Sequence, residues 1–317
     1  MKKKLLSIVL VLVLGLTSSF FLAGCGNGDS GDGGYVFGFT SMDNSNPFFV
    51  ILEQTIRDYV EANGDTLISV DPANDVTLQI NQIEDLIARG IDAIFLNPAE
   101  AEGILPALVA LEEAGIPIIN FDTEIADMEF AESFIGSDNF NAGYVVGRDL
   151  VEKRPEGGDI IILDSPLMNS VVDRTNGFMA AIEGHGFNVV AQQDARGNLQ
   201  IGMDLAEDLL QAHPHVVAIF GGNDPTALGA LAAANAAGLT DVLIYGVDGS
   251  PDIKGELATG TSLIEGSGAQ SPISIGRISV EVMYRFLAGE SVAARYPVPT
   301  FLITHDNVQE FGVDGWQ

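Results

Sequence analysis

Residues 93–122 read Ala-Ile-Phe-Leu-Asn-Pro-Ala-Glu-Ala-Glu-Gly-Ile-Leu-Pro-Ala-Leu-Val-Ala-Leu-Glu-Glu-Ala-Gly-Ile-Pro-Ile-Ile-Asn-Phe-Asp, and this stretch decides the fold class. Two short apolar runs, 93–96 and 117–121, have the length and the Ile and Phe content of buried strands. The segment 101–114 between them is long enough for a helix. A strand, a helix and a second strand in this order are typical of a βαβ unit with parallel strands.

The same alternation extends in both directions along the chain. Further strands are expected at 35–40, 66–70, 134–135, 159–163, 188–192, 216–220, 242–247 and 262–264. Further helices are expected at 47–62, 76–88, 142–153, 176–183, 199–212, 225–237 and 272–288. Parallel strands joined by helices form doubly wound α/β sheets, whose ligands gather outside the carboxyl ends of the strands.

The length of the chain favours two lobes over one. It has 317 residues, of which 47% are hydrophobic, enough for two domains of ordinary size. The sole cysteine, Cys25, leaves no partner for an intramolecular disulfide and no thiolate cluster for zinc or iron–sulfur chemistry. No cofactor or metal is therefore expected, and the stability of the protein must come from its cores.

Polar side chains follow the expected strands at regular intervals. They include Asp122-Thr123, Asn223-Asp224 and Asp248. Each of these residue types is also favoured as a helix cap or in a turn, and Asn97 and Asn139 are interpreted as such. As a set, the residues predict a ligand site where the carboxyl ends of the strands meet.

Several short motifs carry a resemblance to a known family. They are Asn46-Pro47-Phe48-Phe49, Leu96-Asn97-Pro98, Ile116-Pro117-Ile118-Ile119-Asn120-Phe121-Asp122, Ser137-Asp138-Asn139, Arg174-Thr175-Asn176-Gly177-Phe178, Asn223-Asp224-Pro225-Thr226-Ala227-Leu228-Gly229-Ala230 and Gly246-Val247-Asp248-Gly249. In this order and spacing, from about Gly38 to about Val298, the chain resembles the bacterial periplasmic sugar-binding proteins of the ribose and galactose type.

The resemblance implies two Rossmann-like, doubly wound parallel-sheet lobes joined by a three-stranded hinge. The chain would cross between the lobes near Ser137, near 269–271 and near 298–300. The N-terminal lobe would comprise residues 35–136 plus 271–298, and the C-terminal lobe residues 137–270 plus 299–317.

The resemblance also implies a sugar site in the cleft. Planar polar groups would bond the hydroxyls, charged ones most strongly, and an aromatic ring would cover a C–H face of the sugar. Phe49 is favoured over Phe48 for ligand contact, with the other ring in the core. The implied ligand residues are Asn46, Phe48, Phe49, Asp122, Thr123, Arg174, Asn223, Asp248 and Gln270.

Departures from the ribose pattern leave the identity of the sugar open. Thr123 stands where ribose binders carry an arginine, and Val247 where they carry an aromatic residue. The stretch 194–198 also lacks an aromatic residue, although Arg196 or Met168 could partly fill the space. Trp316, near the end of the chain, is not expected to form a wall. Ribose, another pentose, a hexose, a polyol and a furanose all remain candidates.

The N-terminus predicts export and lipid anchoring. Lys2, Lys3 and Lys4 precede an apolar run and the box Leu22-Ala23-Gly24-Cys25, a pattern that resembles bacterial lipoproteins. Residues 1–24 would be a lipoprotein signal peptide, Cys25 the lipidated first residue, and 25–34 a flexible tether. The protein would be extracytoplasmic and held to a membrane by its lipid, in the periplasm or on the outer face of the cytoplasmic membrane.

Charge and motifs exclude several other classes of protein. A formal net charge of −30 argues against a nucleic-acid partner, and fits equally a saline habitat or an acidic lineage. The chain contains no phosphate loop, no zinc-protease helix and no nucleophile elbow, and His213-Pro214-His215 falls in a turn. An enzyme is therefore not expected; the remote alternative is a hydrolase that acts on a small glycoside through two aspartates.

Together these features predict the solute-binding protein of an ABC sugar transporter. It would be a monomer that binds a small sugar by hinge closure and presents it to a permease. The alternative is a sensing component that presents the sugar, or a related small polar molecule, to a chemoreceptor or a sensor kinase.

Overall fold

A computed structural model describes residues 34–317, and Tyr35–Gln317 forms one compact unit. The predicted signal peptide (1–24), the lipidation at Cys25 and nearly all of the predicted tether (25–34) lie outside the described residues. Within residues 34–317 no helix combines the length and the apolar character needed to cross a bilayer.

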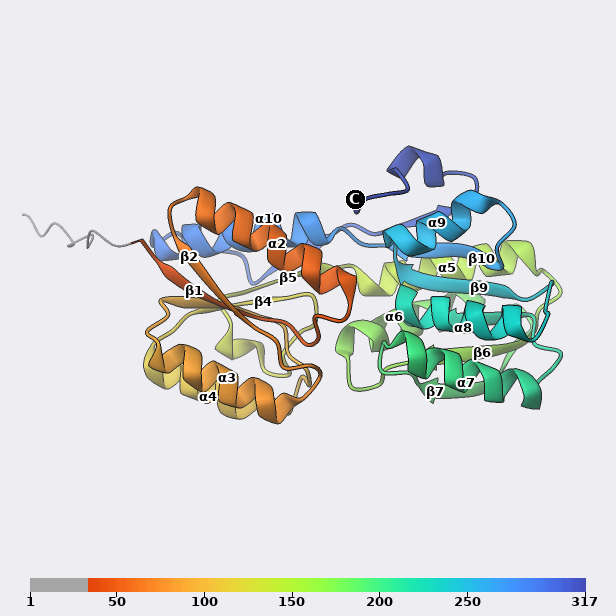
Figure 1. Cartoon of the computed structure of the whole chain (residues 1–317), viewed down its shortest axis with the longest axis horizontal. Helices are drawn as coiled ribbons and strands as arrows, with labels where there is room; N and C mark the ends of the chain where they lie inside the picture. Colours follow the sequence, from red (N-terminus) through yellow and green to blue (C-terminus); the bar gives the residue numbers. More distant parts are fainter. Residues whose placement is uncertain (1–33) are drawn as a thin grey trace, which may run out of the picture. The chain divides into compact units, whose positions relative to one another are not determined.

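The first sheet is six-stranded and parallel, in the order β11-β5-β4-β3-β1-β2. Its strands are β1 (Val36–Thr40), β2 (Thr66–Val70), β3 (Ala93–Leu96), β4 (Ile118–Phe121), β5 (Ser133–Ser137) and β11 (Arg295–Val298). Its helices are α2 (Pro47–Ala62), α3 (Val76–Ala88), α4 (Leu105–Ala114) and α10 (Pro272–Leu287), and a short 3₁₀ turn, η1 (Met128–Phe130), precedes β5. In Figure 1 this sheet lies between α2 and α10 on one side and α3 and α4 on the other.

The second sheet is also six-stranded, in the order β12-β10-β9-β8-β6-β7. Its strands are β6 (Gly158–Asp164), β7 (Phe187–Asp194), β8 (Ala218–Gly221), β9 (Leu243–Asp248), β10 (Ile264–Ala269) and β12 (Phe301–Thr304), and only β12 runs antiparallel. Its helices are α5 (Asn139–Lys153), α6 (Asn169–Ile182), α7 (Leu199–Ala212), α8 (Asp224–Ala236) and α9 (Pro251–Thr259), followed by the 3₁₀ turn η2 (Val308–Phe311).

Each sheet is buried on both faces, which explains the nearly continuous apolar strands of the sequence. In the first lobe, α2 and α10 cover one face through residues such as Leu52 and Met283, and α3 and α4 cover the other through residues such as Leu86. The second lobe repeats this arrangement, with α5 and α6 on one face and α7, α8 and α9 on the other. The expected α/β fold of two parallel-sheet lobes is confirmed.

The chain passes between the two sheets at three places. It leaves the first sheet after Ser137, returns to it after Ala269, and crosses again between Val298 and Phe301. The three crossings follow the carboxyl ends of β5, β10 and β11. The carboxyl ends of the two sheets, which carry the polar residues, therefore face one another across these connections. Figure 1 shows the two lobes with these connections between them.

Most expected elements match, and two differences matter for the site. The helix α6 begins at Asn169, seven positions before the expected start, because the polar and β-branched run after it hides the helix period. The helix α9 was not expected; Ser250 caps it and Pro251 occupies its first turn. Both helices carry residues of the cleft described below.

Candidate ligand-binding site

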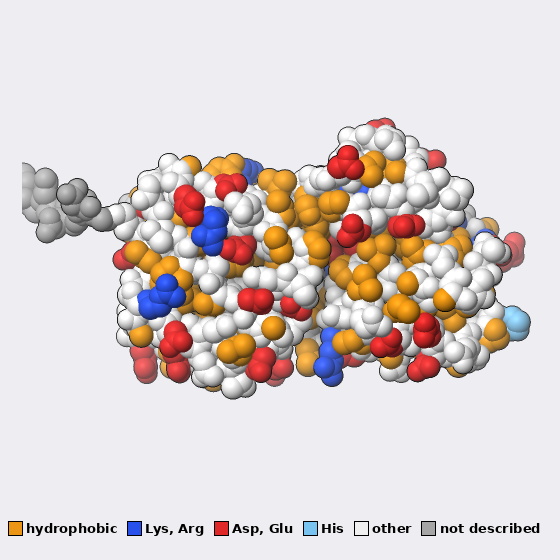
Figure 2. Space-filling view, viewed as in Figure 1, with side chains coloured by type: hydrophobic (Ala, Val, Ile, Leu, Met, Phe, Trp, Pro, Cys, Tyr) orange, Lys and Arg blue, Asp and Glu red, His pale blue; other side chains and the backbone are white. Residues whose placement is uncertain are grey.

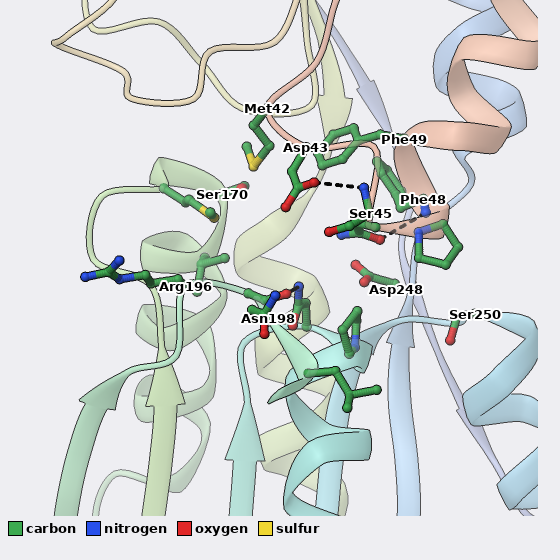
Figure 3. Close-up of a pocket in the computed structure, with 18 of the residues that line it drawn as sticks. Met42, Asp43, Ser45, Phe48, Phe49, Ser170, Arg196, Asn198, Asp248 and Ser250 are labelled. Atoms are coloured by element: carbon green, nitrogen blue, oxygen red, sulfur yellow. Dashed lines mark hydrogen bonds between the residues drawn. The ribbon is translucent and has the colours of Figure 1, made fainter. Parts of the chain in front are cut away.

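A cavity of about 380 Å³ lies between the two lobes, at the carboxyl ends of their strands. Its walls come from the loop after β1 and the start of α2 in the first lobe, and from α6, α7, α8 and the loop after β9 in the second. In the close-up of Figure 3, Phe48 and Phe49 lie above Asp248 and Asn198. The volume is near the lower end of the range of about 300–1,000 Å³ for small-molecule sites.

Asp122 is the buried carboxylate of the first lobe. It directly follows β4, with a backbone φ of 60° that is uncommon for a residue other than glycine. Its Oδ2 accepts hydrogen bonds from Asn97 Nδ2 at 3.3 Å and Thr123 Oγ1 at 3.2 Å. Its Oδ1 has no hydrogen-bond partner among the described residues. Burial raises the pKa of Asp122, and the positive charge of Arg174 opposes that shift.

Two phenylalanine rings form the aromatic side of the cavity. Asn46 caps α2 by accepting a hydrogen bond from the Phe48 amide at 3.0 Å, and Pro47 follows in the first turn. Phe48 and Phe49 stand edge to face, with ring centroids 5.3 Å apart. Both rings line the cavity and also belong to the core of the first lobe, with 2% and 3% exposed. Both rings thus belong to the cavity wall and to the core, and the expected ligand contact of Phe49 stays a prediction.

Arg174 is an almost fully buried cation of the second lobe and lies on α6. Its Nε donates to Asn139 Oδ1 at 2.8 Å, and its Nη1 donates to the Gly222 carbonyl at 3.0 Å and to Asp248 Oδ1 at 3.4 Å. These partners hold the planar guanidinium in one orientation.

Two glycines place Arg174 by letting α5 and α6 cross at backbone distance. A Cβ on Gly143 would lie 1.8 Å from the Arg174 carbonyl oxygen, and a Cβ on Gly177 would lie 1.9 Å from the Phe140 carbonyl oxygen. Any side chain at either position would force the helices apart. The position of the guanidinium thus depends on the absence of these side chains.

Asp248 ends β9 with a φ of 144°, a backbone conformation that normally requires glycine. Its Oδ1 accepts from Gln270 Nε2 at 2.7 Å as well as from Arg174, and its Oδ2 accepts from the Asp224 amide at 3.4 Å. Burial raises the pKa of Asp248 to about 8; Arg174 lowers it, and the neighbouring charge of Asp224 raises it. The second lobe therefore holds two buried carboxylates close to one guanidinium.

Gln270 lies at the second passage of the chain between the lobes. Its Nε2 is used by Asp248, but its buried Oε1 has no hydrogen-bond partner among the described residues. An unpartnered buried polar atom costs about 1–3 kcal/mol. Such an atom on the wall of a cavity is well placed for a donor from a ligand.

Asn223 lines the cavity with both ends of its side chain already bonded. Its Oδ1 caps α8 through the Thr226 amide at 3.1 Å, and its Nδ2 donates to the Gly197 carbonyl at 2.9 Å. The capping interpretation thus accounts for the bond of its oxygen, whereas the bond of its nitrogen holds the loop before α7. Asn46, by contrast, uses only its oxygen as a cap.

Thr123 is the one predicted ligand residue that does not line this cavity. Its hydroxyl lies 2.8 Å from the hydroxyl of Ser170 on α6, which belongs to the other lobe. Asn169 makes a second bond across the lobes, from its Nδ2 to the Glu124 carbonyl at 3.2 Å. The structure therefore joins Thr123 to the opposite lobe directly.

Several residues of the site were not predicted from the sequence. Asn97, interpreted as a cap, holds Asp122 and accepts from the Met42 amide at 3.1 Å. Asn139, interpreted in the same way, holds Arg174. Additional cavity-lining residues are Met42, Asp43, Ser45, Asn74, Ser170, Asn198, Ser250 and Asp252. Met168 and Arg196, which the sequence indicated as residues that could partly fill the space, also line the cavity. A polar residue directly after a strand was the available signal for Asn97.

The position of Trp316 corrects the interpretation of the sequence. It was not expected to form a wall because it lies near the end of the chain, yet it lines the cavity and meets Phe48 with ring centroids 5.8 Å apart. No periodicity or motif in the sequence indicates that the segment after β12 returns to the cleft.

No group of three or more histidine, cysteine, aspartate or glutamate side chains within residues 34–317 is arranged to hold a metal ion. The cavity instead offers hydrogen-bond acceptors, a guanidinium and aromatic faces. Outside it, the face seen in Figure 2 carries many acidic and few basic side chains.

The chain is similar to known binding proteins over most of its length. Residues 37–291 match the periplasmic binding protein domain. The chain is 35% identical to the ribose import binding protein of Escherichia coli K12 over 260 residues, which cover 82% of this chain and 87% of that protein.

Solved structures of solute-binding proteins are also similar to this chain over most of its length. An ABC transporter solute-binding protein from Mycobacterium smegmatis with bound glycerol matches with a TM-score of 0.84 and 30% identity, over 90% of this chain and 98% of that one. A solute-binding protein from Bacillus halodurans C-125 with bound myo-inositol matches with a TM-score of 0.83 and 29% identity, over 90% of this chain and 100% of that one. The chain therefore belongs to the periplasmic binding protein family.

Proposed function

We propose that this protein is the solute-binding component of an ABC transporter and that it binds a monosaccharide or a cyclic polyol in the cavity between its lobes. One observation carries the proposal. Two buried oxygens without a partner among the described residues, Asp122 Oδ1 and Gln270 Oε1, belong to residues that line a single cavity with Arg174 and two phenylalanine rings.

The chemistry of the cavity suits a ring of hydroxyls. Each hydroxyl donates one hydrogen bond and accepts others, so it can satisfy a carboxylate, an amide oxygen and a guanidinium together. The rings of Phe48 and Phe49 can cover an apolar C–H face. The proteins named above bind or import ribose, glycerol and myo-inositol according to their names, which supports the same class of ligand here.

Binding would proceed by hinge closure of a first lobe, 35–136 plus 271–298, onto a second, 137–270 plus 299–317. Asp122 lies on the first and Arg174 and Asp248 on the second, so a ligand bonded to both sides stabilises only the closed arrangement. The contact between Thr123 and Ser170 would form at closure. We further propose that the permease recognises this closed form.

We also propose that lipid on Cys25 anchors the protein outside the cytoplasm, with residues 25–34 as its tether. The Leu22-Ala23-Gly24-Cys25 box supports this part of the proposal. Replacement of Cys25 by Ser should release the protein from membranes into the soluble fraction, and labelled glycerol should no longer be incorporated. Retention of the lipid in that variant would refute the assignment of the anchor.

The ligand class can be tested by thermal unfolding with a panel of pentoses, hexoses and cyclic polyols. A ligand that binds only the native state at 100 times its Kd adds about 2.7 kcal/mol of stability, so the Tm rises measurably. Calorimetry of each hit gives the Kd. A rise for one class, absent in Asp122→Asn, is the expected result. No shift across the panel would refute the proposed function.

A further inference from the structure

We propose that the segment Gly315–Gln317 is part of the ligand site, with Trp316 as a further aromatic wall that limits which polyhydroxy ligand fits. The inference rests on the proposed function and adds a specificity-determining residue to it. After β12 the chain returns to the mouth of the cavity. Figure 1 shows the C-terminal end of the chain beside α9, on the side toward α2.

The chain before this segment is packed onto the second lobe. Val308 is buried in its core, and Phe311 stacks on Phe301 of β12 with ring centroids 4.7 Å apart. His305 Nδ1 lies 2.7 Å from the Leu257 carbonyl oxygen at the end of α9. The part of the chain that leads to Gly315 is therefore held in place by contacts with the second lobe.

Lys254 fastens the segment itself to the second lobe. This lysine on α9 has an exposed fraction of 0%. Its ammonium donates to the Gly315 carbonyl and, at 3.0 Å, to Gln317 Oε1. A buried ammonium is costly unless it is hydrogen-bonded, and these are its hydrogen bonds within the described residues. The hydrogen bonds of this buried ammonium thus depend on the segment being in place.

Gln317 connects the segment to two residues of the cavity. Its Nε2 donates to the Gln270 carbonyl at 2.6 Å and to the Asp248 carbonyl at 3.2 Å. Gly249 permits this approach, because a Cβ there would lie 2.5 Å from the same nitrogen. The segment therefore holds the backbone of the two residues whose side chains face the cavity.

Trp316 reaches from this anchored segment to the first lobe. Its ring lies edge-on to Phe48, with an angle of 74° between the planes, and packs against the core of the first lobe. One segment is thus bonded to the second lobe by Gln317 and in contact with the first through Trp316. Because Trp316 also lines the cavity, its ring stands where it can meet a ligand and limit the size of that ligand.

The unmodified protein provides the first test, because Trp316 is its single tryptophan. Its fluorescence therefore reports one position, at the edge of the cavity. Titration with the sugar or polyol that raises the Tm should shift the emission and reduce quenching by acrylamide, with the same midpoint as calorimetry. Emission and quenching that stay constant at saturating ligand would refute the inference.

Variants provide the second test. Trp316→Ala should lower the affinity for the best ligand at least tenfold, as the loss of a buried aromatic contact generally does. The same variant should bind ligands larger than the best ligand with improved relative affinity. Trp316→Phe should keep most of the affinity. Lys254→Met replaces no residue that lines the cavity and should weaken binding because it releases the segment that carries Trp316. Tyr59→Ala, which removes an exposed aromatic ring from α2, is the control and should bind normally.

The outcomes separate the two proposals. If the unmodified protein binds no member of the panel, the proposed function fails, and this inference fails with it. If the unmodified protein binds a sugar while Trp316→Ala keeps the same affinity and the same order of ligand preference, only the inference about Trp316 is wrong. Circular dichroism of each variant shows whether a loss of affinity reflects unfolding.

Discussion

The two walls of the cleft are built on different principles. On the second lobe, Arg174, Asp248 and Gln270 bond to one another, and Asn139 fixes the guanidinium from behind. On the first lobe, Asp122 has only neutral donors, and one of its oxygens lacks a partner among the described residues. The second wall is therefore cross-linked by hydrogen bonds among its own side chains before a ligand arrives, whereas the carboxylate of the first wall is not; each wall still offers one buried oxygen without a partner among the described residues, Gln270 Oε1 and Asp122 Oδ1.

Charge sharpens this difference. The second wall places Asp248 and Asp224 near Arg174, and burial raises the pKa of both carboxyls. The first wall adds Asp122, whose pKa burial also raises. A single buried guanidinium therefore faces three buried carboxyl groups. Changes to the guanidinium should affect both folding and binding, whereas changes to Asp122 should affect mainly binding.

Replacement of Arg174 by Ala should have the largest effect. It leaves Asn139 Oδ1, the Gly222 carbonyl and Asp248 Oδ1 without their donor in a buried site, and breaking a buried pair in this way costs about 3–5 kcal/mol of stability. Ligand affinity should fall by more than 100-fold, because the same group is lost to the ligand. Urea unfolding and calorimetry measure the two effects. Arg148→Ala, an exposed arginine on α5, is the matched control; a stable Arg174→Ala protein with normal affinity would contradict the comparison.

Replacement of Asp122 by Ala should separate binding from stability. A hydrogen bond to a charged group contributes about 1.5–3 kcal/mol, so the Kd should rise by about 10- to 100-fold. The unliganded protein should keep its stability or gain some, since the carboxyl is buried, strained and incompletely bonded. Asp122→Asn keeps the shape of the side chain and removes only its charge, so it should also lose affinity and shows that the loss does not come from a cavity. A large loss of stability in Asp122→Ala would show that the first wall is organised in the same way as the second.

The difference between the walls also explains how far the sequence predicts the site. Asp122 directly follows β4 and Asp248 is the last residue of β9, so the topology alone brings each of them to the carboxyl edge of its sheet. The strands 66–70 and 93–96 and the helices 47–62, 76–88 and 199–212 match the structure because their apolar periods are regular. The fold class is therefore predictable from local pattern.

The supporting residues are less predictable because they depend on distant contacts. Asn97 and Asn139 look like caps in the sequence, yet they orient Asp122 and Arg174 from other elements. Ser170 lies in the first turn of a helix that was expected to begin later. Trp316 reaches the cavity only because Lys254 and Gly249 accept its segment. Such tertiary contacts leave no periodic signal in the sequence.

The stability of the unliganded protein should depend on pH, mainly through the second wall. The pKa of Asp248 is about 8 in the folded protein and near 3.8 in the unfolded chain. Between these values the folded state holds a proton that the unfolded state has lost, so stability falls as the pH rises from about 4 to about 8. Asp224 and Asp122 shift in the same direction.

Urea unfolding of the unliganded protein at pH 5 and pH 8 measures this effect. Asp248→Asn stays uncharged throughout and keeps the shape of the side chain, so its stability should fall less over the same interval. Equal pH slopes for the original protein and the variant would mean that Asp248 is ionised in the folded state across the range. In that case Arg174 would outweigh the effect of burial.

The smallest expected effect concerns the contact between the walls. Thr123→Val keeps the shape of the side chain and removes the hydroxyl that lies 2.8 Å from Ser170 Oγ. One neutral hydrogen bond contributes about 1 kcal/mol, so the Kd should rise by about fivefold if this bond forms only in the closed state.

A double-mutant cycle tests whether the bond acts between the lobes. Ser170→Ala should weaken binding about as much as Thr123→Val, and the double variant should be no weaker than either single one, since the same bond is lost in each. Fully additive losses would mean that the two hydroxyls act separately, Thr123 through its second contact with Asp122 Oδ2. Because the hydroxyls come from opposite lobes, a non-additive result ties ligand affinity to closure, and an additive one ties it to the first wall alone.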